Sequence, residues 1–539
     1  MKNHNPDKLD AEFLDSDLHS GQLPIPHRFS VSSEGIISTQ HYLATQAGVQ
    51  MLQAGGNAID AAVAAAWALG VCEPAASGLG GQTMMLIHLA KTRRTFALDG
   101  SSRAPNLTSR ATFSPSDYLR GYKATTVPST PAVLSYALDK YGTMKLDQVL
   151  APVIQLAEEG YRVTELQRRL TRRQRKHLRA GTAAAFFLKD GKRTYKVGEL
   201  FRQPVLAQTL KTIAAKGVKE FYTGKIAKLI HLDMIRNGGL IRLDDLAQRP
   251  RPIERRPVTC HFDGTRVFTF PPPGAGRCLI EMLNMISHFP VKSRNPDTPQ
   301  GALRLAHVIQ QAFRDRGDRP FEPNYYAQVS SKRMLSVEYG ARIARQIRKK
   351  IRTSGETTHL SVMDRWGNVV ALTQSIERVY GACAVTPELG FLYNNYMMAY
   401  ERENIRHPYY LRPNAVPWAS VAPTIIFRGH KPWLAIGSPG SERIVSSILQ
   451  VLLRLGRQSA YEAVDAPRLH CSLEGKVSLE AARMRDDIPK LLEKHGFLID
   501  EREPYSFYLG CVQLVMREGN EFLGVADPRR DGSSGGPYG

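Results

Sequence analysis

Cysteine is scarce in this chain, and its histidines are widely spaced. Six cysteines stand among 539 residues, and no two of them form a C-x-x-C pair. This spacing excludes a disulfide-stapled scaffold and a zinc finger, and it favours reduced thiols. The fifteen histidines contain no H-x-x-x-H or H-x-H pair, which argues against a metalloenzyme. We therefore expect neither a metal site nor a cofactor.

Long apolar runs are also missing. The longest weakly charged stretch, Ile59–Cys72, is too short to span a bilayer and has the alanine spacing of a helix. Residues Met1–His19 contain acidic side chains and no apolar core, so they do not resemble a secretory signal. We expect a cytoplasmic protein that has no membrane contact.

Acidic residues are few compared with basic ones. The chain has 72 Lys and Arg against 50 Asp and Glu, which gives a formal charge of +22. Basic clusters occur at Arg168–Arg179 and Arg345–Arg352. They can form a solvated face, or they can attract an anionic substrate or partner. Aromatic residues do not interleave with these arginines, which argues against nucleic-acid binding by stacking.

One short stretch indicates a specific chemistry, namely Glu356-Thr357-Thr358-His359-Leu360-Ser361-Val362. It can simply be the start of a strand, because Thr, Leu and Val are ordinary strand residues, and the turn at Asp364–Asn368 predicts a hairpin that begins here. A threonine hydroxyl is a poor nucleophile unless a base accepts its proton. If the bond between Glu356 and Thr357 is cut, the new α-amine of Thr357 can act as that base. Thr357 is therefore the candidate nucleophile.

Further motifs stand in order on both sides of this stretch. Downstream are Gly390-Phe391-Leu392-Tyr393-Asn394-Asn395, Ala422-Pro423-Thr424-Ile425, Gly437-Ser438-Pro439-Gly440-Ser441 and Ala526-Asp527-Pro528-Arg529. Upstream are Gly55-Gly56-Asn57-Ala58-Ile59-Asp60-Ala61-Ala62-Val63, Glu73-Pro74, Ser77-Gly78-Leu79-Gly80-Gly81 and Pro271-Pro272-Pro273-Gly274. In this order, and over nearly the whole chain, they resemble the γ-glutamyltranspeptidase family.

The resemblance implies an α/β fold, a four-layer αββα sandwich of the N-terminal-nucleophile hydrolase type. It implies a large part, residues 1–356, and a small catalytic part, residues 357–539. The two parts should stay associated after self-cleavage, because neither can bury its apolar faces alone.

Local patterns agree with strands in both parts and helices between them. Helices are predicted at 44–54, 58–69, 302–314, 336–352 and 444–455, and through most of 135–230. Strands are predicted at 84–89, 95–98, 267–270, 358–363, 369–374, 424–427, 434–436, 476–480 and 510–516. Residues 1–30 are predicted to form a loosely held arm.

The resemblance also gives catalytic roles to residues downstream of Thr357. Ser375 stands where the family has a second threonine whose hydroxyl hydrogen-bonds the nucleophile; the alternative is a solvent-facing strand serine. Gly440 and Ser441 stand where the family has two glycines whose backbone N–H groups form an oxyanion hole, a device that contributes about 3 kcal/mol in the transition state. The alternative for these two residues is a tight turn before a helix.

The residues that hold the α-carboxylate and α-amine of the substrate in the family are changed here. The aligned positions carry Ser101, Glu377, Tyr396, Ala399 and the pair Ala419-Ser420. A serine cannot form the bidentate pair with a carboxylate that arginine forms, and an alanine cannot pair with an ammonium. Arg103 can take over the carboxylate, and Glu377 can receive a cationic group. We expect glutathione itself to be a poor substrate.

The leading hypothesis is a self-cleaving threonine amidase. It would transfer a γ-glutamyl or related anionic acyl group from an amide to water or an amine through an acyl-enzyme. One alternative is an acylase for another side chain, such as a glutaryl amide. A second is a catalytically weak relative that binds polyanions. A serine hydrolase is disfavoured, because the one G-x-S-x-G match, at Gly532–Gly536, has no helix after it.

Overall fold

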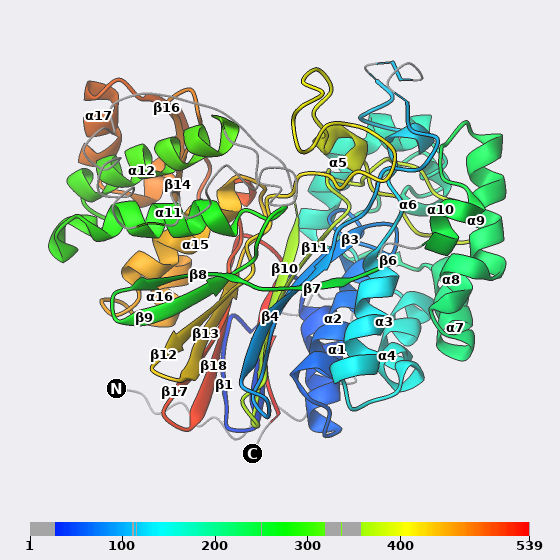
Figure 1. Cartoon of the computed structure of the whole chain (residues 1–539), viewed down its shortest axis with the longest axis horizontal. Coiled ribbons are helices and arrows are strands. Elements are labelled where there is room, and N and C mark those ends of the chain that lie inside the picture. Colours follow the sequence, from blue (N-terminus) through cyan, green and yellow to red (C-terminus); the bar gives the residue numbers. More distant parts are fainter. Residues whose placement is uncertain are drawn as a thin grey trace.

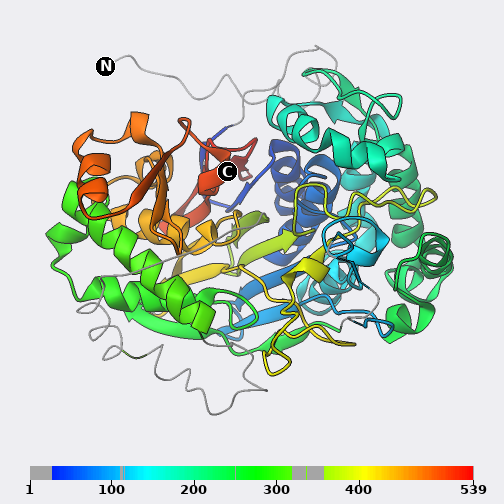
Figure 2. The ribbon, with the colours of Figure 1, turned by 90° about the horizontal axis from the view of Figure 1, so that it is seen from above.

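A computed structural model describes residues 27–109, 113–114, 116–248, 251–318, 336 and 357–537. Two seven-stranded sheets lie face to face between two groups of helices (Figure 1). Seen from above, the same layers run side by side across the molecule (Figure 2). The predicted αββα sandwich is confirmed. Three predicted features lie outside the described residues. These are the arm up to residue 26, the helix at 336–352 with its basic cluster, of which only Ser336 is described, and Glu356.

Each sheet contains strands from both sides of Thr357. The first sheet has the order β1 (Phe29–Ser32), β18 (Glu521–Ala526), β17 (Gln513–Glu518), β13 (Lys431–Gly437), β12 (Thr424–Arg428), β9 (Thr265–Thr269) and β8 (Val258–Phe262). The second has the order β19 (Ser533–Gly535), β2 (Gly35–Thr39), β10 (Thr358–Asp364), β11 (Val369–Ser375), β3 (Gln82–Leu89), β4 (Arg94–Gly100) and β7 (Ile253–Arg255). All neighbours in both sheets are antiparallel.

Two groups of helices cover the outer faces. The second sheet is covered by α1 (Tyr42–Gln53), α2 (Ala58–Cys72), α3 (Thr130–Tyr141), α4 (Leu146–Glu159), α5 (Glu165–Ala180), α6 (Ala184–Phe187), α7 (Pro204–Lys216), α8 (Lys219–Thr223), α9 (Lys225–Arg236) and α10 (Leu243–Gln248), with the short pair β5 (Tyr161–Arg162) and β6 (Leu200–Phe201). The first sheet is covered by α11 (Gly276–Ser287), α12 (Pro299–Asp318), α15 (Arg443–Arg454), α16 (Ala460–Asp465) and α17 (Asp487–Lys494), with β14 (Leu469–Cys471), β15 (Lys476–Leu479) and β16 (Leu498–Glu501). Of the described helices, none is both long and apolar enough to cross a bilayer.

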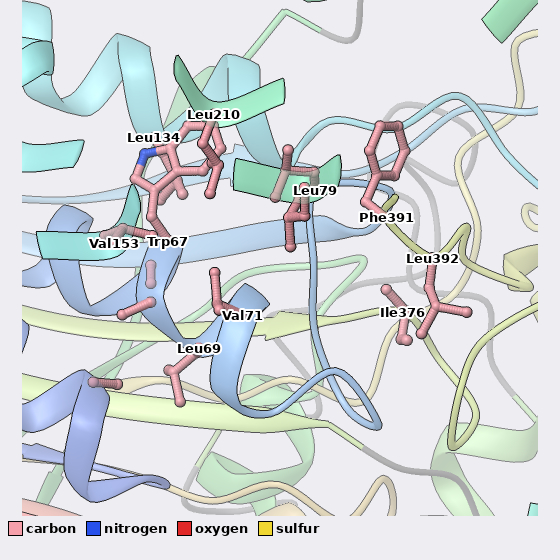
Figure 3. Close-up of a cluster of buried hydrophobic side chains, with 14 of the residues drawn as sticks. Trp67, Leu69, Val71, Leu79, Leu134, Val153, Leu210, Ile376, Phe391 and Leu392 are labelled. Carbon is pink, nitrogen blue, oxygen red and sulfur yellow. The ribbon is translucent and has the colours of Figure 1, made fainter. Parts of the chain in front are cut away.

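Apolar clusters fill the three spaces between the layers. One lies between the sheets and includes Ile36, Met84, Met363, Ile425, Ala435 and Val515. The largest lies between the second sheet and its helices, where every residue of α2 is buried. Figure 3 shows part of this cluster, with Ile376 and Leu392 beside each other at one end. The chain that follows β11 is therefore held by apolar packing.

The predicted hairpin is present and is joined to α2. The side chain of Asn57 caps α2, and Asp60 completes a capping box. Asp364, in the hairpin turn, accepts a hydrogen bond from the backbone N–H of Ala58 at 2.9 Å. It also accepts one from the side chain of Asn368 at 2.7 Å. The hairpin thus takes its position from the first turn of α2.

The Ala526–Arg529 motif forms a buried ion-pair network. Asp527 contacts Arg468 at 2.5 Å and Arg529 at 3.0 Å, and all three side chains are fully buried. Arg529 also contacts Glu480 at 2.6 Å. Burial alone would raise the pKa of Asp527, but the two arginines hold this pKa below its usual value. The network joins the end of β18 to the segment around β14 and β15.

Several boundaries differ from the sequence prediction by a few residues, and two of these differences have a clear structural cause. Phe29 and Ser30 belong to β1, not to a loose arm, because β1 pairs with β18 and Arg28 donates a hydrogen bond to the carbonyl of Arg530 at 2.8 Å. The strand predicted at 510–516 begins only at Gln513. Before it, Gly510 has a φ of +82°, and the N–H of Cys511 is bonded to the hydroxyl of Ser438. Both differences come from contacts with distant residues.

We predict that Asp527→Asn lowers the free energy of unfolding by about 3 kcal/mol, because it removes the ion-pair partner of the buried guanidinium of Arg468. Urea denaturation followed by tryptophan fluorescence measures this change. Asp487→Asn is the matched control, since Asp487 pairs with Arg485 where both side chains are more than half exposed. The control should leave the midpoint nearly unchanged. Equal midpoints for both variants would contradict the role given to the network.

Candidate active site

Thr357 stands directly before β10 and is only 4% exposed. The ladder between β10 and β11 pairs Thr358 with Gln374, so one step further Thr357 falls opposite Ser375. On the other side of β11, Ser375 pairs with Gln82 of β3. Residues directly opposite each other in antiparallel strands have Cβ atoms about 5 Å apart. The structure therefore brings Thr357, Ser375 and Gln82 into one row.

The alternation of side chains along β10 shows which way this row faces. Leu360 and Val362 belong to the cluster on the helix side, whereas Met363 lies between the sheets. By the same alternation, Thr358 faces the helices and Thr357 faces the space between the sheets. The candidate nucleophile thus points toward the first sheet.

Thr358 is tied to the end of α2. Its hydroxyl donates a hydrogen bond to Glu73 Oε2 at 2.6 Å. Arg530 donates to Glu73 Oε1 at 2.8 Å. Burial raises the pKa of Glu73, and the contacts with Arg530 and Thr358 oppose that rise. The residue next to Thr357 is therefore held by a buried ion pair that links residues far apart in the chain.

His359 is a structural residue. Its Nδ1 lies 2.9 Å from the hydroxyl of Thr373, and its Nε2 lies 3.0 Å from the hydroxyl of Ser361. Burial lowers the pKa of its imidazole to about 3, so the ring is neutral near neutral pH. A Cβ on Gly437 would lie 2.1 Å from this ring. The end of β13 can approach β10 this closely only because residue 437 is glycine.

Beyond Gly437, the first sheet leads into the loop that carries Gly440 and Ser441. Their φ angles are +114° and +53°, respectively. Their carbonyls accept hydrogen bonds from Arg443 and Ile444, which begin α15. Within the described part of the chain, the backbone N–H groups of Gly440 and Ser441 donate to no acceptor. Two buried donors without partners are what an oxyanion hole requires before it is filled.

Three of the predicted site residues meet at the end of β11. The hydroxyl of Ser375 accepts a hydrogen bond from the N–H of Glu377 at 2.8 Å, and Glu377 has a φ of +76°. Tyr396 is buried, and its phenol is close enough to the side chains of Ser375, Gln82 and Glu377 for all three to act on its pKa. Burial and the charge of Glu377 raise the pKa of this phenol. Ser375 is thus a buried member of a polar group, not a solvent-facing serine.

The other predicted substrate residues, Arg103 and Ser420, make separate contacts. Arg103 donates a hydrogen bond to the carbonyl of Asn414 at 3.1 Å, and its charge lowers the pKa of the Tyr400 phenol, which burial raises. The hydroxyl of Ser420 lies 3.2 Å from that of Ser441, in the candidate oxyanion loop. The Ser101 hydroxyl donates a hydrogen bond to Asp99 Oδ1 at 2.6 Å.

Sequence reasoning gave no role to several residues of this region. Glu73 belongs to the Glu73-Pro74 motif, but nothing in that motif predicts its bond with Thr358. No sequence pattern predicts a role for Gln82. Glu442 follows Ser441, and burial raises its pKa to about 7, opposed by the charges of Arg316 and Arg443. A carboxyl group that titrates near neutral pH therefore lies next to the candidate oxyanion loop. Among the described residues, no cluster of His, Cys, Asp and Glu is suited to hold a metal ion.

Comparison with known proteins gives consistent matches over the chain. A family model described as gamma-glutamyltranspeptidase matches residues 44–536. The glutathione hydrolase proenzyme of Escherichia coli K12 is 33% identical over 536 residues, covering 92% of this chain and 91% of that protein. The acylase ACY 1 proenzyme of Pseudomonas sp. strain V22 is 32% identical, covering 82% and 83%. The crystal structure of cephalosporin acylase from Bacillus halodurans superposes with a TM-score of 0.87 at 28% identity, covering 97% of this chain and 99% of that one.

We predict that His359→Gln changes the pH dependence of stability. Glutamine keeps a donor and an acceptor for Thr373 and Ser361, but it does not titrate. The folded imidazole has a pKa of about 3, against 6.5 for the free side chain, so the unfolded chain binds the additional proton between these values. The free energy of unfolding of the wild type then falls by up to about 1.4 kcal/mol per pH unit below about pH 6.5.

The variant lacks this contribution. The difference between the two free energies of unfolding should therefore narrow as the pH falls, which urea titrations at a series of pH values measure. Parallel curves for the two proteins would show that His359 is not neutral in the folded state.

Proposed function

We propose, since this chain belongs to the γ-glutamyltranspeptidase family, that Thr357 is the nucleophile of a self-cleaving amidase that transfers a γ-glutamyl or related acyl group. The observation that carries this proposal is the row of Thr357, Ser375 and Gln82, on the side of β10 where His359 meets Gly437 at the end of β13, three residues before the two unbonded N–H groups. It supplies a hydroxyl, a neighbouring hydroxyl and an oxyanion site on facing sheets.

The first reaction is self-cleavage between Glu356 and Thr357. The Thr357 hydroxyl attacks the carbonyl carbon of Glu356, the C–N bond breaks, and the acyl group moves from nitrogen to oxygen. Water hydrolyses this ester, which gives a carboxylate at Glu356 and a free α-amine at Thr357. The hydrogen bond from Thr358 to Glu73 supports this step, because it fixes the backbone directly after the reacting residue.

The second reaction uses the new amine as a base. It accepts the hydroxyl proton while the Thr357 oxygen attacks the carbonyl of the substrate amide. The N–H groups of Gly440 and Ser441 stabilise the oxyanion, and Ser375 orients the nucleophilic hydroxyl. The amine product leaves with a proton, and water or a second amine then takes the acyl group from the ester. No metal or cofactor is required for these steps.

The substrate would lie between the end of β11 and the Ser420–Ser441 pair. Arg103 binds a carboxylate of the acyl group, and Glu377 pairs with its α-ammonium. Tyr396 and Ser420 add hydroxyl groups on the two sides. The positive φ of Glu377 supports this role, because such a conformation directs the side chain away from the regular strand position.

The fragments 1–356 and 357–539 would remain one molecule after cleavage. In the second sheet, β10 lies between β2 of the large part and β11 of the small part, and β11 in turn pairs with β3 of the large part. Separation would break ladders in both sheets and expose the cluster between them.

An acylase for a glutaryl-type amide is the second candidate. Ala399 offers no charge to an α-ammonium, and two of the relatives compared above are named acylases. A glutaryl group has the carboxylate of a glutamyl group without its amine. Among the residues proposed to bind the substrate, Glu377 distinguishes the two candidates. A γ-glutamyl substrate has an ammonium group that can pair with Glu377, whereas a glutaryl substrate has none.

We expect Thr357→Ala to remain a single uncut chain of 60.0 kDa without amidase activity, since both reactions lose their nucleophile. The wild type should give two fragments, the smaller beginning with Thr357. Intact mass spectrometry and N-terminal sequencing measure this. Thr212→Val is the control, because its hydroxyl lies on the exposed side of α7 and bonds only the carbonyl of Gln208. Two fragments from Thr357→Ala would refute the proposal.

We expect Glu377→Gln to raise KM for γ-glutamyl-p-nitroanilide at least about tenfold, since it removes the charge that pairs with the ammonium. KM for glutaryl-p-nitroanilide should stay within about twofold, because that compound has no ammonium. Glu403→Gln, which neutralises an exposed glutamate in the loop after Tyr400, is the control. If the wild type cleaves only the glutaryl compound, the acylase is the correct assignment.

A further inference from the structure

Helix α5 carries an unusual excess of positive charge. It contains seven Lys and Arg residues and one acidic residue, Glu165. Arg172, Arg175, Lys176 and Arg179 are exposed, and their spacing of three and four residues places them on one side of the helix. In the described part of the chain, the seven cations form one ion pair, between Arg168 and Glu165 at 3.5 Å. We call these four exposed residues the α5 stripe.

Residues at the C-terminal end of α5 line a pocket of about 600 Å³. Its lining includes Arg120, Lys123 and His177, and its one acidic residue, Asp117, is paired with Lys123 at 3.2 Å. Arg120 is held by a hydrogen bond to the side-chain oxygen of Gln174 at 2.8 Å. We call this the α5 pocket. It contains fixed positive charge and a volume that suits one or two amino-acid side chains.

Lys176 and Arg378 add positive charge near His177 in the α5 pocket. Burial lowers the pKa of His177, and the charges of Arg120, Lys176 and Arg378 lower it further. Each of these groups would hold its charge at lower cost beside an anion, because like charges at short range repel. A negatively charged ligand would therefore relieve the repulsion between these groups.

The α5 pocket and the candidate active site share a segment of chain. β11 ends at Ser375, which belongs to the site, and the chain that follows supplies Glu377 to the site and then Ala382, Cys383 and Ala384 to the pocket wall. Asn395 ties both regions together, since it accepts a hydrogen bond from the N–H of Arg378 and donates one to the carbonyl of Leu119. Figure 1 shows α5 beside the loops of this segment.

We propose that the α5 pocket and the α5 stripe bind the carboxylates of an acidic peptide that forms the leaving part of the acyl donor. This inference rests on the proposed function and names the class of amide that the site prefers. A peptide fits better than a nucleic acid, because the α5 stripe has no aromatic side chain for base stacking. The positive surface would also raise the rate at which acidic donors arrive.

The test compares two donors, γ-Glu-Glu-Glu and γ-Glu-Gln-Gln, which have the same length and differ in charge. At low ionic strength the wild type should show kcat/KM about tenfold higher for the acidic donor, and about 0.5 M NaCl should remove most of this preference. Arg172→Gln combined with Lys176→Gln should reduce the preference to about twofold or less, chiefly through KM. Turnover of γ-glutamyl-p-nitroanilide should not change.

Lys225→Gln combined with Lys228→Gln is the matched control. It removes the same charge from exposed positions near the start of α9 and should keep the preference for the acidic donor. Equal kcat/KM values for the two donors in the wild type, or equal effects of the two double variants, would overturn the proposal.

A binding experiment separates this proposal from the proposed function. Fluorescently labelled tri-glutamate is titrated into Thr357→Ala protein with and without the Arg172/Lys176 changes, and anisotropy is measured. Binding that the double variant loses supports the anionic site even if γ-glutamyl-p-nitroanilide is never cleaved. If single-stranded DNA or inorganic polyphosphate displaces the peptide at much lower concentration than unlabelled tri-glutamate does, the assignment to acidic peptides is wrong.

Discussion

The hydrogen-bond ladder of β10 is the constraint on which the rest of the site depends. Its register with β11, and that of β11 with β3, decides that Thr357, Ser375 and Gln82 stand in one row. A slip of one residue would turn every side chain of β10 to the other face. His359 would then lose both hydrogen bonds and its contact with Gly437. The packing between the sheets therefore stabilises this register.

Buried charge supports the same arrangement from outside the row. Glu73 holds Thr358, Asp364 holds the hairpin turn, and Asp527 joins the end of β18 to its neighbours. Each carboxylate is buried and has charged or backbone donors around it, which is the condition under which a buried charge can persist. The basic surface is separate from this scaffold, and the proposed recognition of acidic peptides gives it a role.

Much of the fold could be predicted because local patterns agree with it. The capped helix after Asn57, the hairpin at 358–375 and the helix near 444–455 follow from composition and turn residues, and the αββα class follows from the resemblance. The predictions for Phe29 and Gly510 were wrong, because their conformations depend on partners hundreds of residues away or across the sheet. The catalytic roles of Ser375, Gly440 and Ser441 stay predictions, now with positions that suit them.

The sequence by itself determined the nucleophile candidate and the family, and its resemblance to that family led us to expect that Ser101 and Ala399 replace charged substrate-binding groups, because these inferences follow from residue identity in order along the chain. Only the tertiary structure decided that Ser375 is buried beside Tyr396, that Glu73 holds Thr358, and that Arg120 and His177 share a pocket with the end of α5. Such contacts join residues that are distant in sequence, and chain order carries no information about their distance until the sheets assemble.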